Sequence, residues 1–85
     1  MNIKNGTWVK MMSGDRDRVG EYTQVRNIEP SGRCEFVGHV DMCYGNIDEI
    51  GTPEQFTGEW WKTSPRLSYV LVDPLDVPTY LRNRM

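Results

Sequence analysis

The sequence predicts a mainly β protein: a small barrel or a strongly curved antiparallel sheet of four to five strands, with one or two short helical turns. The chain of 85 residues contains no alanine and four leucines, whereas valine, isoleucine and threonine together number eighteen. Alanine is the best helix former, and β-branched residues favour strands. Eight glycines and five prolines divide the chain into short segments. The length fits one domain, residues 1–85.

Three strands are predicted in the first half of the chain. Thr7–Met12 alternates between two faces and is followed by a polar loop. Glu21–Ile28 and Arg33–Val40 form a hairpin, because Glu29–Gly32 between them is a turn sequence. In this turn the proline presets φ and the glycine permits a positive φ.

The second half of the chain predicts two more strands and a helical turn between them. Met42–Ile47 is a fourth short strand, with a bend or bulge at Gly45-Asn46. Thr52–Gln55 has the residues of a capping box with proline at the first helical position, so a short helix begins there. Leu67–Val72 is apolar at nearly every position, which predicts a strand that is central or covered on both faces.

Residues 74–85 are predicted to form a C-terminal extension or a short helix. Asp73-Pro74 ends the preceding strand, and Asp76–Pro78 is a helix start. A short helix through Arg84 would dock through Tyr80 and Leu81.

The opening of the chain resembles an SH3-like barrel of the KOW type. The resemblance rests on Gly6–Lys10, followed by Ser13-Gly14 and then by Gly20 and Val25. In that family a G-x-x-V-x-V strand enters a glycine-bearing loop and a G-x-V strand returns. Met11 stands where the family usually has a second valine. The resemblance covers about a quarter of the chain and implies a small barrel, without implying a ribosomal or transcriptional role.

Charge and patterning exclude several classes of function. The net charge is −2, so the chain lacks the basic excess of a general nucleic-acid binder. Met1–Lys10 has no apolar segment of signal-peptide length, and no stretch approaches the ~20 apolar residues of a membrane span. We therefore expect a cytoplasmic protein with reduced thiols and no membrane association.

One cluster of chemically versatile residues occurs in the sequence, between residues 34 and 43. Cys34, His39, Asp41 and Cys43 are all possible zinc ligands, but strand alternation puts Cys34 on the face opposite the other three. His39 is the only histidine, and no phosphate loop or dinucleotide motif is present. The sequence therefore predicts no metal site, no cofactor and no catalytic residues, that is, not an enzyme.

Large aromatic residues point instead to protein binding. Adjacent Trp60 and Trp61 cannot both face inward on a strand, and exposed Trp and Tyr are enriched at interfaces. We predict a non-catalytic module that binds another protein stoichiometrically, as an inhibitor, adaptor or accessory subunit of the kind that phages and mobile elements encode. The predicted anchors and acidic rim are Trp60, Trp61, Tyr44, Asp48, Glu49, Glu54 and Glu59.

Two alternatives stay open. A nucleic-acid-binding barrel would combine basic side chains with Trp8 and Tyr22 as stacking surfaces. A homo-oligomeric structural subunit would bury surface that a small core leaves exposed. The basic residues of the first alternative are Lys10, Arg16, Arg18, Arg26 and Arg33.

Overall fold

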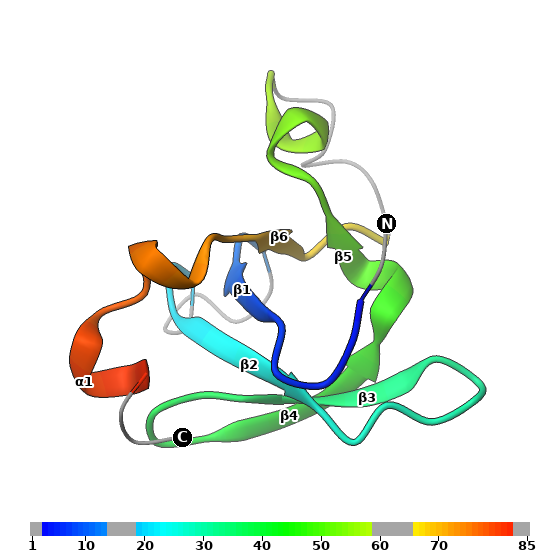
Figure 1. The fold of residues 1–85 in the computed structure, drawn as a ribbon. Helices are drawn as coiled ribbons and strands as arrows, with labels where there is room; N and C mark the ends of the chain where they lie inside the picture. The colour runs from blue at the N-terminus through cyan, green and yellow to red at the C-terminus, as the bar shows by residue number, and fades with distance from the viewer. Residues whose placement is uncertain (1–2, 14–18, 59–65, 83–85) are drawn as a thin grey trace.

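The fold is a single curled sheet, seen in a computed structural model that describes residues 3–13, 19–58 and 66–82 (Figure 1). Six strands follow one another in the sheet in the order β4-β3-β2-β1-β6-β5. The strong curl gives a half-barrel, in agreement with the predicted fold class. The strands are β1 (Trp8–Met11), β2 (Tyr22–Arg26), β3 (Arg33–Val37), β4 (Met42–Asn46), β5 (Ile50–Gly51) and β6 (Tyr69–Leu71).

The sheet differs from the expectation at one edge. The pairs from β4 to β6 are antiparallel, but β5 pairs with β6 in parallel. The two residues of β5, Ile50 and Gly51, are too few to show an alternating pattern, so the sequence contains no signal for this strand. The other predicted strands are present but shorter. The predicted strand Leu67–Val72 does lie inside the sheet as β6, between β1 and β5.

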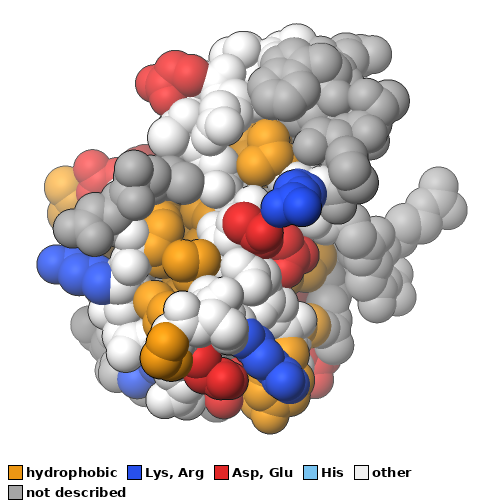
Figure 2. All heavy atoms as spheres, turned by 90° about the vertical axis from the view of Figure 1, so that its right-hand side faces the viewer, with side chains coloured by type: hydrophobic (Ala, Val, Ile, Leu, Met, Phe, Trp, Pro, Cys, Tyr) orange, Lys and Arg blue, Asp and Glu red, His pale blue; other side chains and the backbone are white. Residues whose placement is uncertain are grey.

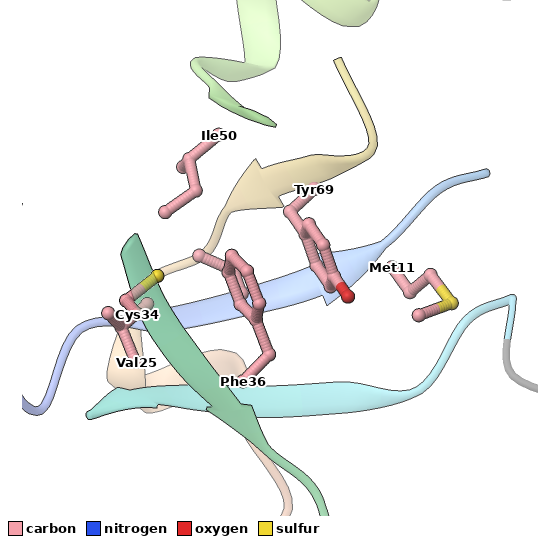
Figure 3. Close-up of a cluster of buried hydrophobic side chains, with 7 residues drawn as sticks. Met11, Val25, Cys34, Phe36, Ile50 and Tyr69 are labelled. Atoms are coloured by element: carbon pink, nitrogen blue, oxygen red, sulfur yellow. The ribbon is translucent and has the colours of Figure 1, made fainter. Parts of the chain in front are cut away.

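The first hydrophobic core lies inside the curl (Figure 3). The rings of Phe36 on β3 and Tyr69 on β6 stack face to face, with centroids 3.9 Å apart. These strands are separated by β2 and β1 in the sheet, so only strong curvature brings the two rings together. The buried members of this core are Val9, Met11, Val25, Cys34, Phe36, Ile50 and Tyr69.

A second core lies on the opposite face of β1. Trp8 is only 6% exposed there, because Val77 and Leu81 of the C-terminal segment cover it. This segment contains a 3₁₀ turn, η5 (Pro74–Asp76), and a single helical turn, α1 (Thr79–Arg82). Leu81 docks as predicted, whereas the prediction for Tyr80 is wrong, since its side chain is 65% exposed. One helical turn presents only one side to the sheet, and Leu81 occupies it.

Local backbone chemistry sets the ends of the strands. Asn27 adopts a left-handed φ of 52°, which ends β2 two residues before the predicted Ile28. The turn before β3 follows the prediction: the Gly32 N–H donates to the Glu29 carbonyl, and Gly32 has a φ of 96°. The loop is therefore a three-residue hairpin connection closed by a glycine.

Gly45 does not mark the predicted bend or bulge. The β3–β4 register runs without interruption from Met42 to Asn46, with Gly45 opposite Cys34. A Cβ atom at residue 45 would lie 2.6 Å from Phe36 Cε2 and 2.6 Å from Glu49 Oε2. The glycine is needed because a ring and a carboxylate cover its Cα, which is a packing requirement that the turn-like dipeptide Gly45-Asn46 does not reveal.

One 3₁₀ turn precedes β5 and another follows it. Residues Ile47–Glu49 form η2, which joins the two edge strands β4 and β5 directly. Residues Pro53–Phe56 form η3 at the predicted capping sequence, where the Thr52 N–H donates to Gln55 Oε1 over 2.8 Å. The predicted helix is thus present as a 3₁₀ turn.

Candidate protein-binding surface

Exposed apolar side chains gather at the β3–β4 hairpin and the neighbouring α1. Val40 at the tip of the hairpin is 84% exposed, and Tyr44 on β4 is 63% exposed. Tyr80 of α1 meets His39 of the hairpin edge to face, with ring centroids 5.5 Å apart. We call these four residues, together with Met42 on β4, the hairpin surface.

A hollow of about 360 Å³ opens within this surface. Its walls come from three segments that are distant in sequence: the residues entering β2, the tip of the hairpin and the C-terminal segment. Tyr22, Pro78 and Leu81 supply its apolar lining, and the carboxylates of Glu21 and Asp41 add negative charge. Its remaining lining residues are Gly20, His39, Val40 and Tyr80.

Tyr44 lies on the outer face of the sheet, as strand alternation requires. Its neighbours on β4, Cys43 and Gly45, pair with the inward-facing Phe36 and Cys34. The guanidinium of Arg33 lies 5.1 Å from the centroid of the Tyr44 ring. The cation–π contact steadies the ring while most of the side chain stays exposed, as expected of an interface anchor.

Of the predicted acidic residues that the structure describes, one stabilises a turn and two are exposed. The Glu49 carboxylate accepts a hydrogen bond of 2.7 Å from the Asn46 N–H and is half-buried, so it caps η2. Asp48 forms an exposed ion pair of 3.1 Å with Arg66. Glu54 is exposed on η3. The side of the molecule in Figure 2 has acidic and basic side chains interspersed, without a field of one sign.

Three of the predicted nucleic-acid-binding residues share the outer face of the sheet. The Lys10 Nζ lies 5.7 Å from the centroid of the Tyr22 ring, and Arg26 donates to Gln24 Oε1. Arg33 is the third. The predicted stacking role of Trp8 is wrong, because this ring is covered by the C-terminal segment.

Five predicted site residues fall outside the part of the chain that the structure describes. They are Arg16, Arg18, Glu59, Trp60 and Trp61. Their roles stay predictions.

The thiols and the histidine do not form a shared site. Among residues 3–13, 19–58 and 66–82, no three His, Cys, Asp or Glu side chains lie where they could hold one metal ion. Cys34 faces the inner core, whereas His39 lies exposed in the hairpin. Burial, with the negative charges of Glu49 and then Glu35, raises the pKa of the Cys34 thiol to about 11. A thiol in this environment stays protonated and is a poor nucleophile.

Comparisons with known proteins do not assign the chain to a family. No protein-family model, curated protein or solved structure matches it. Within the described residues, no helix has the length and apolar character needed to cross a bilayer.

Sequence reasoning found one member of the hairpin surface, Tyr44, and missed the others. Val40 lies in a predicted strand, Met42 reads as an ordinary strand residue, and Tyr80 reads as a docking residue. The sequence does contain turn-favouring residues here, Gly38 and Asp41. They flank a two-residue turn, and the residues between them are therefore exposed.

Proposed function

We propose that this chain is a small non-catalytic module that binds another protein stoichiometrically, as an inhibitor, adaptor or accessory subunit. The observation that supports it is the hairpin surface: exposed apolar and aromatic side chains around a hollow, on a fold whose core is otherwise covered. Such side chains, close to a concavity and bordered by charge, are typical of interface anchors. A cytoplasmic modulator encoded by a phage or mobile element fits this description by analogy of type.

We further propose that the half-barrel is of the SH3-like type. Its support is the resemblance of the β1–β2 region to the KOW opening, together with the curled small sheet.

The test is capture by the immobilised full chain from a lysate of the source cells, with variants as the readout. We expect Val40→Asp and Tyr80→Ala to reduce recovery of a specific protein at least tenfold, because each removes an exposed contact. Leu75→Asp is the matched control, since Leu75 is an exposed apolar residue outside the hairpin surface. Trp61→Ala in the same assay tests the predicted tryptophan anchor. Recovery that is equal for all variants, or no specific protein at all, would contradict the proposal.

Nucleic-acid binding is the second candidate. Its support is that Lys10, Arg26 and Arg33 lie on one face of the sheet. Acidic residues flank this face, since a second hollow of about 680 Å³ that contains Lys10 also includes Asp73 and Asp76. A mobility-shift titration at low salt tests this candidate: binding at micromolar protein that weakens as salt rises would favour it over protein binding.

A further inference from the structure

The free edge of the sheet at β4 has an open hydrogen-bonding face. Among the described strands, β4 pairs with β3 alone. The Gly38 N–H donates to the Asp41 carbonyl at one end of this pair, and the Ile47 N–H donates to the Gly32 carbonyl at the other. Bonded and non-bonded pairs alternate along an antiparallel ladder. Met42 and Tyr44 therefore direct their N–H and C=O groups away from β3.

Within the described part of the chain, the open stretch of β4 has defined ends and no feature of its own that would prevent pairing. The next outward N–H, that of Asn46, is already bonded to Glu49 Oε2 over 2.7 Å. The strand Met42–Asn46 contains no charged residue, no proline and no bulge. Charged side chains, proline and bulges are among the features by which natural edge strands prevent pairing with another chain. The β4 edge uses none of them.

We propose that β4 pairs antiparallel with β4 of a second copy of this chain, with Met42 opposite Tyr44 in both directions. Each of these two residue pairs exchanges two hydrogen bonds, so the four open groups of each copy are all used. The twofold axis then passes between Cys43 and Cys43 of the second copy. A twofold dimer needs a self-complementary patch, and this register provides one.

The side chains of β4 favour a second copy of this chain as the occupant of the edge. On the outer face, Met42 of one copy meets the Tyr44 ring of the other, and both are exposed in the single chain. Methionine sulfur interacts favourably with aromatic rings. No like charges oppose each other when an uncharged strand pairs with itself. The proposal depends on the backbone of β4 and does not rest on the proposed function, whose test uses Val40 and Tyr80.

The first experiment is sedimentation equilibrium of the full chain across a range of micromolar concentrations. We expect a monomer–dimer equilibrium in the wild type, and a dimer dissociation constant at least tenfold higher for Met42→Pro, which removes an outward N–H without removing a β3–β4 bond. Met42→Val keeps the N–H and is the matched control. Circular dichroism checks that each variant is folded. A monomer at every concentration, or equal dimerisation of Met42→Pro, would overturn the proposal.

A second experiment needs no change in the edge. Facing residues of a non-bonded antiparallel pair have Cα atoms about 4.5 Å apart, which is within disulfide range. Mild oxidation of the Cys34→Ser variant should therefore give a dimer linked through Cys43, identified by mass spectrometry of its peptides. A dimer that oxidation does not link through Cys43 would contradict the register and favour another interface.

Discussion

The rings of Phe36 and Tyr69 lie parallel within 5°, and their centroids are 3.9 Å apart. Phe36 belongs to β3 and Tyr69 to β6, and the two residues are far apart in sequence. The stack therefore joins two strands that share no hydrogen bonds in the ladder order. The two rings can stack only because the sheet curls strongly enough to bring β3 and β6 face to face.

Removing half of this stack should destabilise the fold strongly. We expect Phe36→Ala to lower the free energy of unfolding by about 3–5 kcal/mol, because the ring is fully buried and leaves a cavity. Tyr44→Ala is the control, and it should change the free energy by no more than about 1 kcal/mol, since Tyr44 is exposed. Urea unfolding measures both values.

The contribution of the stack itself can be separated from burial. A double-mutant cycle of Phe36→Leu and Tyr69→Leu should give a coupling energy of about 0.5–1.5 kcal/mol, the range for interacting aromatic pairs. Additive effects of the two substitutions would show that only burial matters at this contact.

Neighbouring residues of α1 should differ sharply in their effect on stability. Leu81→Ala should lower the free energy of unfolding by about 2–4 kcal/mol, because Leu81 packs with Val77 over Trp8. Tyr80→Ala should change it by less than about 1 kcal/mol, since that side chain is exposed. Thermal unfolding of the two variants makes the comparison, and equal losses would contradict the docking of α1 through Leu81.

A side chain at residue 45 should destabilise the fold. We expect Gly45→Ala to lower the free energy of unfolding by about 1–3 kcal/mol, because the added methyl group overlaps the Phe36 ring and the Glu49 carboxylate. If the strain is local, Gly45→Ala combined with Glu49→Ala should lose less than the sum of the two single changes. Urea unfolding of the three variants tests this expectation.

Cys34 should make stability depend on pH in the alkaline range. Its pKa is raised from 9.0 to about 11 in the folded chain, so the folded state holds the thiol proton more tightly than the unfolded state. The stabilisation is complete below pH 9 and declines as the pH rises from 9 towards 11. The difference in unfolding midpoint between wild type and Cys34→Ala across this range isolates the effect from other titrating groups.

The cause of that shift can be tested separately. Glu49→Gln removes a nearby negative charge, so the pKa of Cys34 should fall while remaining above its ordinary value because burial is the larger cause. The ultraviolet absorbance of the thiolate against pH, in the Cys43→Ser background, measures the pKa without needing a reagent to reach the buried thiol. An unchanged value in Glu49→Gln would exclude the electrostatic contribution.

The β class, the β2–β3 hairpin, the capping turn at Thr52 and the break at Asp73-Pro74 could all be predicted from the amino-acid sequence. Each of these depends on local chemistry: backbone preferences of glycine and proline, and side chains that bond their own backbone. Tyr44 was predicted as an interface anchor for a different reason, the enrichment of aromatic residues at interfaces, and its side chain is exposed in the structure.

Tertiary structure decided the features that depend on what lies opposite a residue. Alternation places Trp8 and Val9 on opposite faces of β1. Val9 is buried by the core inside the curl, but Trp8 is buried only because the C-terminal segment docks on the outer face. Leu81 is buried and Tyr80 exposed because one helical turn has a single inward side. The parallel β5 and the open edge of β4 follow from the order of strands in the sheet, which pairs segments far apart in the chain and leaves no local pattern to read.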